Sequence, residues 1–330
     1  MFANKTFLIT GCRGFLGKRL LRVLIEHLDH LQEKGESYTH HIYAIDNGIT
    51  SSTVFETYPN YVSFFDANAI TFDYASLKTV DYIIHMAGLA SPAQYKRYPL
   101  ETIDVAVSLT RTLLQHSINW NAKFVFFSSS EIYGNPDPLH VPTSESFNGY
   151  VSTMGPRSCY DESKRLGETL CYVFHQYFSV HTAIIRPFNI FGPGMSKHDY
   201  RMVPNLMRAA IEMKSIKIYG DGSQTRTFCY LDDAIDGIIR VLKYSESGSA
   251  YNIGNPSPEI SMIELVHLFN DVTESMVPYE VVDYPDHYPA DEPLRRCPDI
   301  SKAVDKLNYK PKTELSNGLI QTFEWCKTHY

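Results

Sequence analysis

The chain has 330 residues, of which 44% are hydrophobic and 20% charged, and its formal net charge is −7. This acidic balance argues against nucleic acid and anionic membranes as partners, and no apolar run approaches the roughly 18 residues that span a bilayer. Six scattered cysteines without C-x-x-C or zinc spacing, and an N-terminus without signal-peptide features, predict a reduced cytoplasmic enzyme with no structural metal.

The first predicted elements form a dinucleotide-binding unit. Residues 5–10 read as a buried strand, and a helix with leucines at spacings of three and four follows. Between them lies G-x-x-G-x-x-G, in which glycines allow a tight turn and the helix N-terminus receives a pyrophosphate. The predicted cofactor contacts of this turn are Gly11, Gly14, Phe15, Leu16 and Gly17.

The next three strands supply further cofactor contacts. Residues 32–40 read as a polar loop, and the strand at 41–45 ends in Asp46 and Asn47. A carboxylate there binds both ribose hydroxyls and repels a 2′-phosphate, which favours NAD over NADP, although a loop-capping Asp is the plainer alternative. Strand 61–65 ends in Asp66, predicted near adenine, and strand 81–86 runs into Ala87 and small residues that admit the cofactor's ribose.

A helix is predicted at 102–117, and the strand at 123–127 then delivers a hydroxyl-rich segment that ends in a carboxylate. Side chains at the carboxyl end of a central parallel strand face the crevice in which such sheets bind ligands. Ser129 or Ser130 is expected to hydrogen-bond the reacting oxygen of a substrate. Glu131 is expected to have a raised pKa in an apolar crevice and to act as an acid or base, with turn capping as the alternative.

A long helix from Gly155 carries Tyr160 and Lys164. Residues four apart lie on one helical face, so the phenol and the ammonium can share a pocket, and the cation is expected to lower the pKa of the phenol. Such a phenol can take a proton from a hydroxyl while hydride leaves the carbon that bears it; a solvated pair is the alternative. The helix's apolar stripe suits either the core or a homodimer contact and comprises Leu166, Leu170, Val173, Phe174 and Tyr177.

After the strand at 181–186 the alternation of strands and helices breaks. A helix is predicted at 203–214 and a strand at 216–219, and a strand at 250–254 returns to the sheet. The predicted fold is therefore α/β, a Rossmann-type doubly wound parallel sheet with a smaller, interleaved C-terminal substrate domain. Residues 1–190, with 230–255 returning, form the first domain, and residues 191–229 and 256–330 form the second.

Two arginines in polar turns of the second half, Arg226 and Arg296, would suit a diphosphate if they converge, because the guanidinium fork matches phosphate oxygens. Each taken alone is more often a surface cation.

Together these motifs resemble the extended short-chain dehydrogenase/reductases that act on nucleotide sugars, and within them the UDP-glucuronate decarboxylases. The resemblance covers nearly the whole chain. It is carried by G-x-x-G-x-x-G, S-E-I-Y-G-N-P at 130–136, G-P-R-S-C-Y-D-E-S-K-R at 155–165, Y-G-D-G-S-Q-T-R-T-F-C-Y at 219–230 and D-E-P-L-R-R-C-P-D-I at 291–300. Gly194 and Tyr200 depart from the usual G-P-R-M and D-G-R patterns of these decarboxylases, at substrate-loop positions.

The resemblance implies NAD as cofactor and a UDP-sugar as substrate. Tyr160 would be the base for the C4 hydroxyl, Lys164 would hold Tyr160 and the nicotinamide ribose, and Ser129 or Ser130 would bind the C4 oxygen. Glu131 and Arg226 would lie near the C5/C6 end of the sugar, with Asn189 and Arg296 at the diphosphate and Arg226 sharing that task. The full predicted substrate-binding set is Ser91, Asn189, Val203, Tyr219, Arg226 and Arg296.

Three other functions remain open at this stage. A nucleotide-sugar 4,6-dehydratase would share the first oxidation, but glucose-type dehydratases place Asp-Glu where this chain has Ser130-Glu131, whereas GDP-mannose dehydratases have Ser-Glu. A 4-epimerase would leave Glu131 without an evident task. A non-catalytic NAD or nucleotide sensor would not need the Tyr160/Lys164 pair.

Overall fold

The structure is a computed structural model that describes residues 2–33, 39–50, 57–284 and 293–330. The predicted loop at 32–40 falls largely outside the described residues, as do Asp291 and Glu292 at the start of the last sequence motif.

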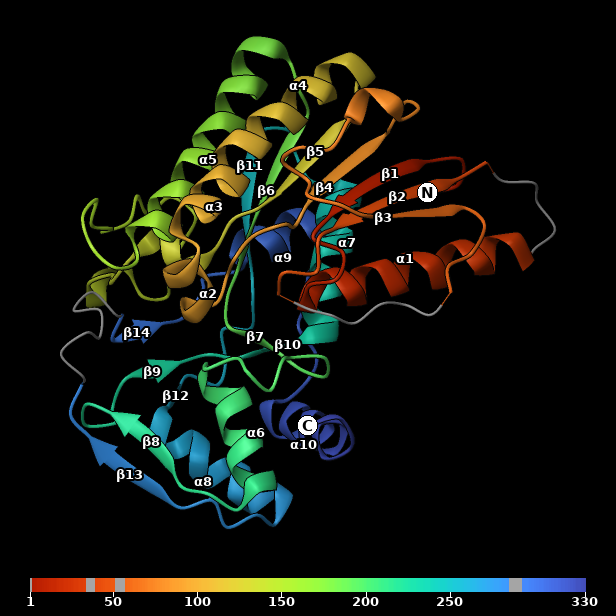
Figure 1. The fold of residues 1–330 in the computed structure, drawn as a ribbon. Coiled ribbons are helices and arrows are strands. Elements are labelled where there is room, and N and C mark those ends of the chain that lie inside the picture. Colours follow the sequence, from red (N-terminus) through yellow and green to blue (C-terminus); the bar gives the residue numbers. More distant parts are fainter. Residues whose placement is uncertain (1, 34–38, 51–56, 285–292) are drawn as a thin grey trace.

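A seven-stranded sheet forms the centre of the molecule (Figure 1). Every neighbouring pair of strands in it is parallel, and the strand order is β11-β6-β5-β4-β1-β2-β3. From β1 the chain adds β2 and β3 on one side and then β4, β5, β6 and β11 on the other, as in a doubly wound fold. The strands are β1 (Thr6–Thr10), β2 (His41–Asp46), β3 (Val62–Asp66), β4 (Tyr82–His85), β5 (Lys123–Phe127), β6 (Thr182–Pro187) and β11 (Ser249–Ile253). The predicted fold class is confirmed.

Helices cover both faces of this sheet (Figure 1). One face packs against α1 (Phe15–Glu33), α7 (Leu231–Tyr244) and α9 (Ser301–Leu307), whose apolar residues share one core with the strands. The other face packs against α4 (Thr110–Trp120) and α5 (Ser158–Phe178). Because both faces are buried, the strands are nearly continuous apolar runs, which is why the sequence located them to within about two residues.

The helix predicted at 102–117 is present but longer and interrupted. It consists of α3 (Pro99–Asp104), a π-helical turn η2 (Val105–Leu109) and α4. The carbonyl oxygen of Val105 accepts a hydrogen bond from Nε2 of His85 on β4 at 3.1 Å. A side chain that engages a helical carbonyl is a recognised local cause of such irregular turns, and no spacing rule in the sequence signals it.

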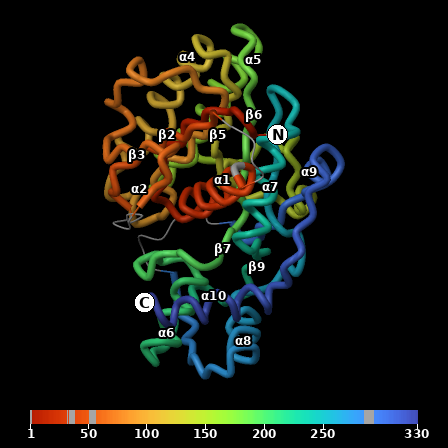
Figure 2. The backbone as a smooth tube through the Cα atoms, turned by 90° about the vertical axis from the view of Figure 1, so that its right-hand side faces the viewer, coloured from red at the N-terminus to blue at the C-terminus, as the bar shows by residue number. Residues whose placement is uncertain are grey.

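A second apolar core lies below the sheet in Figure 1. It is built from α6 (Met202–Glu212), α8 (Met262–Thr273), α10 (Leu315–His329) and a parallel pair of strands, β8 (Ile216–Tyr219) and β13 (Tyr279–Val282). Figure 2 shows α10 beside α6 and α8, whereas α9 runs beside α7. The segment 256–330 therefore contributes helices to both cores.

Short elements connect the two cores. A two-stranded pair joins β7 (Ile190–Phe191) and β10 (Cys229–Tyr230), and a three-stranded sheet has the order β12 (Ile260–Ser261), β9 (Thr225–Arg226), β14 (Arg295–Arg296). The remaining helical elements are α2 (Pro92–Arg97), η1 (Tyr74–Ser76), η3 (Ser130–Tyr133) and η4 (Pro138–His140). None of the helices in the described part of the chain has the length and apolar character needed to cross a membrane.

Candidate active site

The glycine turn between β1 and α1 has no room for side chains. Gly11 has a φ of +78°, and a Cβ there would lie 2.5 Å from the backbone nitrogen of Ala87. A Cβ on Gly17 would lie 2.1 Å from the carbonyl oxygen of Gly11, so helix and turn are in backbone contact. The amide of Gly14 donates to that same oxygen at 3.1 Å. The turn therefore presents bare backbone at the start of α1, which suits a pyrophosphate.

Asp46, at the end of β2, faces this turn. Its Oδ2 accepts the amide of Arg13 at 2.9 Å and its Oδ1 accepts the amide of Gly48 at 2.8 Å. Asp66 lies beside it but pairs with the Arg13 guanidinium at 3.1 Å. That guanidinium also stacks over the ring of Phe64 at 4.5 Å. Arg13, which the sequence reasoning did not single out, thus flanks the predicted adenosine position, while Asn47 caps its own turn through Ile49.

Ala87 closes the other side of the turn through its backbone. Its amide donates to Thr10 Oγ1 at 3.4 Å, and that hydroxyl is hydrogen-bonded to His85 Nδ1 at 2.8 Å. Met86 and Gly88, its two neighbours, line the main cavity, as do Phe15 and Leu16 at the start of α1. The segment after β4 therefore connects the glycine turn to the cavity.

The Tyr160/Lys164 pair lies buried at the start of α5, and both side chains line the cavity. Lys164 Nζ donates to the carbonyl oxygen of Phe127 at 2.7 Å and lies 5.8 Å from the centre of the Tyr160 ring. The Tyr160 hydroxyl is hydrogen-bonded to that of Ser129, and both Ser129 and Ser130 line the cavity. The ring of Tyr95 stacks on Tyr160 at 5.3 Å. A phenol, an ammonium and a hydroxyl thus meet in one pocket, as the helical spacing predicted.

The pKa values of this pair differ from the prediction. Burial raises the pKa of Tyr160 to about 12, and the hydrogen bond with Ser129 opposes this only in part. Burial also lowers the pKa of Lys164 to about 8. The pKa of the Tyr160 phenol is therefore raised rather than lowered as expected, because desolvation is the largest influence on both groups.

Glu131 lies in a cationic pocket rather than an apolar one. Its carboxylate forms two ion-paired hydrogen bonds with Arg296, at 2.6 and 2.8 Å, and a third with Arg157. Burial alone would raise its pKa, but the charges of Arg296, Arg157 and Arg226 lower it. The predicted raised pKa is wrong, and Glu131 is ionised at neutral pH, able to accept a proton or orient a water molecule but not to act as an acid.

Asp161, one helical turn along from Arg157, completes this ionic cluster. Its Oδ2 accepts a hydrogen bond from Arg157 Nε at 3.3 Å, and its Oδ1 is buried without a partner among the described residues. Burial raises the pKa of Asp161 to about 7, against the lowering effect of Arg157. Neither Arg157 nor Asp161 was assigned a role from the sequence, although both lie in the G-P-R-S-C-Y-D-E-S-K-R motif.

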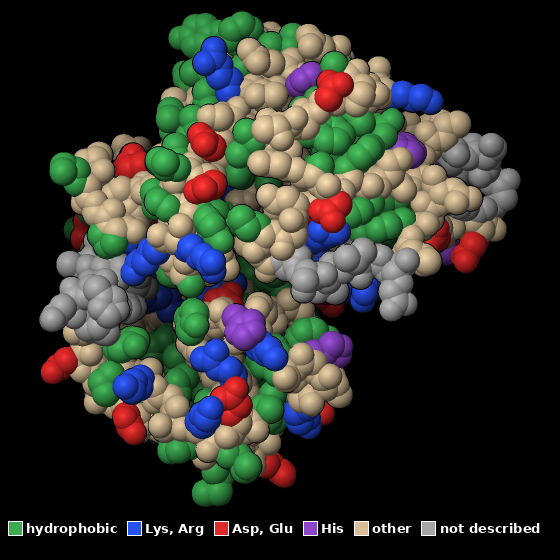
Figure 3. Space-filling view, viewed as in Figure 1, with side chains coloured by type: hydrophobic (Ala, Val, Ile, Leu, Met, Phe, Trp, Pro, Cys, Tyr) green, Lys and Arg blue, Asp and Glu red, His purple; other side chains and the backbone are tan. Residues whose placement is uncertain are grey.

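The cavity beside these groups has a volume of about 520 Å³ and lies between the carboxyl ends of the sheet strands and the second core. Its described lining holds one carboxylate, Glu131, and seven positive side chains: Lys96, Arg157, Lys164, Arg201, Lys217, Arg226 and Arg296. Figure 3 shows Lys and Arg side chains gathered where the upper and lower parts of the molecule meet. Such a cavity favours a ligand with several negative charges.

Comparison with known proteins agrees with this geometry. Residues 7–254 match the model of the NAD dependent epimerase/dehydratase family. The chain belongs to this family. UDP-glucuronic acid decarboxylase 3 of Arabidopsis thaliana is 36% identical over 318 residues, which cover 96% of this chain and 87% of that protein. UDP-glucuronic acid decarboxylase 1 of Xenopus tropicalis is 32% identical over 326 residues, covering 98% and 72%.

Solved structures of the family superpose over nearly the whole chain. The crystal structure of UDP-glucuronic acid 4-epimerase from Bacillus cereus, in complex with UDP-glucuronic acid and NAD, has a TM-score of 0.82 at 25% identity and covers 98% of this chain and 100% of that one. dTDP-glucose 4,6-dehydratase from Streptomyces venezuelae has a TM-score of 0.81 at 23% identity, covers 97% and 96%, and shows the shared fold. As an NAD-dependent family member, this chain uses NAD, and its glycine turn and Asp46 fit that cofactor.

The structure brings most predicted substrate residues of this family member to the cavity. Asn189, Val203, Tyr219, Arg226 and Arg296 line it. Ser91, the residue before α2, is not part of the described lining, although Ala90 and Pro92 on either side of it are.

Asn189 and Arg226 are also used for structure. The Asn189 amide donates to the Thr227 carbonyl at 2.9 Å, and the Arg226 guanidinium donates to the carbonyls of Pro293 and Leu294. Arg296 makes two ion-paired hydrogen bonds with Glu131, and the charge of Arg226 also lowers the pKa of Glu131.

The two departures from the family pattern lie on the cavity side. Gly194 has a φ of +97°, and a Cβ there would meet only Phe15, at 3.8 Å. Tyr200 is 63% exposed, lines the cavity, and precedes Arg201, whose guanidinium pairs with Asp199 at 2.5 Å. Gly194 therefore leaves open space beside Phe15, where the usual arginine would place a cation.

Proposed function

We propose that this chain is a UDP-glucuronate decarboxylase that converts its substrate to UDP-xylose. The observation that carries the proposal is the cavity lining, in whose described part seven cations face a single carboxylate. A diphosphate together with a sugar carboxylate supplies the negative charges that such a lining needs. Relatives named UDP-glucuronic acid decarboxylase match over almost the whole chain and support the same substrate.

The chain's own groups suit oxidation at C4. Tyr160 would take the proton of the C4 hydroxyl, and Ser129, hydrogen-bonded to Tyr160, would hold the same oxygen. NAD, when bound, accepts the hydride from C4 and returns it at the end, so it is not consumed. Lys164, fixed by the Phe127 carbonyl, would place a positive charge beside the phenolate that forms.

Loss of carbon dioxide then follows from the chemistry of the sugar. With a ketone at C4, the C6 carboxylate is β to a carbonyl, and its departure as CO₂ leaves an enolate at the former C4 oxygen. Hydrogen-bond donors already aimed at that oxygen, Ser129 and Tyr160, stabilise the developing charge. Protonation at C5 and return of the hydride complete UDP-xylose.

The charge state of Glu131 argues against a 4,6-dehydratase. That reaction needs an acid to protonate the hydroxyl leaving C6, and the one carboxylate in the described lining is held ionised by Arg157 and Arg296. A 4-epimerase acting on the same sugar is the second candidate, because an epimerase in complex with UDP-glucuronic acid shares the fold at 25% identity.

Products distinguish these reactions. Purified protein with NAD and UDP-glucuronate should release CO₂ and form a UDP-pentose, seen by mass spectrometry. UDP-galacturonate without CO₂ would show an epimerase, and a 4-keto-6-deoxy product from a nucleotide-glucose would show a dehydratase. Tight NAD binding without turnover of any sugar nucleotide would show a sensor.

A homodimer is also proposed. The helices α3 and α5 leave large apolar side chains between 38% and 72% exposed: Leu100, Ile103, Leu166, Tyr172, Tyr177 and Phe178. An apolar face of this kind on two neighbouring helices fits a second copy of the chain. Light scattering should give twice the chain mass, and Leu166→Glu should give monomers, whereas Tyr244→Glu on α7 should leave the dimer intact.

We also propose the cytoplasm as the location. All six cysteines are free thiols in the structure, as expected in a reducing compartment. Cell fractionation tests this proposal.

A further inference from the structure

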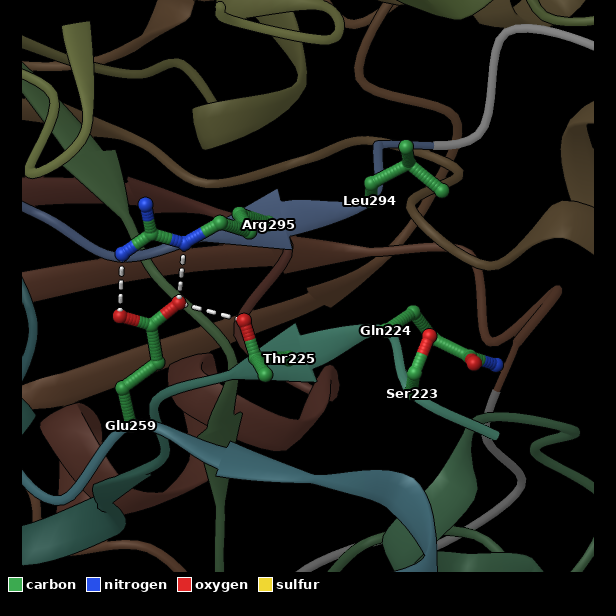
Figure 4. A pocket seen from close by; sticks show the side chains of 6 residues that line it. All are labelled: Ser223, Gln224, Thr225, Glu259, Leu294 and Arg295. Atoms are coloured by element: carbon green, nitrogen blue, oxygen red, sulfur yellow. Dashed lines mark hydrogen bonds and ion pairs between the residues drawn. The ribbon is translucent and has the colours of Figure 1, made fainter. Parts of the chain in front are cut away.

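Three short strands bring the two arginines of the cavity together. In the sheet β12-β9-β14, Arg296 pairs with Arg226 and Arg295 pairs with Thr225. Successive residues of a strand point to opposite faces. Arg226 and Arg296 line the cavity, so Thr225 and Arg295 face the other way, toward a second, smaller pocket (Figure 4).

On that outer face one carboxylate joins all three strands. Glu259, immediately before β12, accepts hydrogen bonds from Arg295 Nε at 2.8 Å and from a second Arg295 nitrogen at 2.7 Å. Its Oε1 also accepts the hydroxyl of Thr225 (Figure 4). The hydrogen bond with Arg295 lowers the pKa of Glu259, so the pair is charged at neutral pH. The three side chains form a clamp, which we define as Glu259, Arg295 and Thr225.

The clamp lies at a strand that has only a few backbone hydrogen bonds to its neighbour. β14 is two residues long and bonds to β9 through Thr225 N to Leu294 O at 2.9 Å and Thr227 N to Arg296 O at 3.1 Å. The Leu294 amide also donates a hydrogen bond to Asn135 Oδ1 at 3.0 Å. The Arg226 guanidinium holds the Pro293 and Leu294 carbonyls from the cavity face, and the clamp holds Arg295 from the outer face, so β14 is fixed from both sides.

The position of β14 matters because Arg296, its second residue, lines the cavity. Arg296 holds Glu131 through bonds of 2.6 and 2.8 Å, and Glu131 lies two residues after Ser129, which is hydrogen-bonded to Tyr160. A displacement of about 1 Å in such a site can cost roughly 100-fold in rate. We propose that Glu259 is a positioning residue for the substrate site, which sets Arg226 and Arg296 from the outer face of the sheet. This inference rests on the proposed function.

The test compares Glu259→Gln and Arg295→Gln with the double variant. In each, kcat/KM for UDP-glucuronate should fall by roughly 10- to 100-fold. NAD affinity should be unchanged, because the glycine turn is built from β1 and α1. The melting temperature should stay within about 3 °C of wild type, because the ion pair is partly exposed. The double variant should lose no more than the worse single variant, because all three remove the same clamp.

The matched control is Glu246→Gln, which removes the exposed pair of Glu246 with Lys306 at 2.9 Å, remote from the cavity lining. It should leave kcat/KM unchanged. A kcat/KM of Glu259→Gln within twofold of wild type would overturn the proposal. So would a joint fall of NAD affinity and melting temperature, which would indicate general damage to the fold.

Affinity for UDP separates this proposal from the proposed function. If the wild-type protein releases no CO₂ from UDP-glucuronate, the decarboxylase assignment fails, but Arg226 and Arg296 still line the cavity. Calorimetry with UDP in the presence of NAD then decides the matter. A tenfold weaker affinity in Glu259→Gln supports the clamp as a positioning device, and an unchanged affinity refutes it.

Discussion

The buried carboxyl of Asp161 makes a quantitative prediction about stability. An Asp carboxyl ordinarily has a pKa of 3.8, and burial raises that of Asp161 to about 7. Between these two pH values the folded protein holds a proton that the unfolded chain has released. The free energy of unfolding therefore falls as pH rises, by about 1.4 kcal/mol per pH unit, and levels off above pH 7 after a total loss of about 4 kcal/mol.

Asp161→Asn removes this titration while keeping the shape of the side chain. An amide oxygen can still accept the hydrogen bond from Arg157 Nε, now 3.3 Å long. The variant should therefore gain about 2–3 kcal/mol relative to wild type between pH 5 and pH 7. Urea unfolding at pH 5, 6, 7 and 8, followed by the fluorescence of Trp120 and Trp325, measures the difference.

The matched control is Asp271→Asn, an exposed carboxyl on α8. Its stability should track that of the wild type at every pH. If the Asp161→Asn and wild-type curves also run parallel from pH 5 to pH 8, Asp161 is not protonated in the folded protein, and the reasoning about its burial is refuted.

Three further substitutions test the site. Tyr160→Phe should keep NAD affinity and lower kcat by roughly 10²–10⁴-fold, because proton transfer from the C4 hydroxyl is lost; turnover near the wild-type rate would remove Tyr160 from its role. Glu131→Gln should keep NAD and UDP-glucuronate binding in calorimetry while product formation is lost, and a loss of NAD instead would mean that Glu131 belongs to the cofactor site. Asp46→Ala should weaken NAD binding by about 1–3 kcal/mol in the same assay, and equal affinity would show that Asp46 only caps its turn.

The sequence predicted the parts of the site that depend on local spacing. The strand at 123–127 and the strand at 216–219 have the predicted bounds, and the glycine turn lies between a strand and a helix as expected. Tyr160 and Lys164 share a pocket because four residues make about one helical turn. The sequence left the convergence of Arg226 and Arg296 as a condition, and in the structure both side chains line one cavity.

Long-range charge could not be predicted in the same way. Glu131 meets Arg157, 26 residues away, and Arg296, 165 residues away. Nothing in the segment around Glu131 indicates these partners, so its hydroxyl-rich and apolar neighbours predicted a raised pKa. The same limit applies to Asp161, whose pKa depends on burial by elements outside its own helix.

For the Tyr160/Lys164 pair, the sequence spacing predicts where the side chains lie but not their pKa values. Spacing places the two groups together, but the cavity that encloses them disfavours both charged forms, so the phenol keeps its proton and the ammonium loses one more easily than in water. A base with a pKa of about 12 is inactive at neutral pH unless positive charge is added beside it. Bound NAD in its oxidised form would supply positive charge on its nicotinamide ring, so we expect proton removal by Tyr160 to depend on NAD and Tyr160 to titrate at lower pH in the complex than in the free protein.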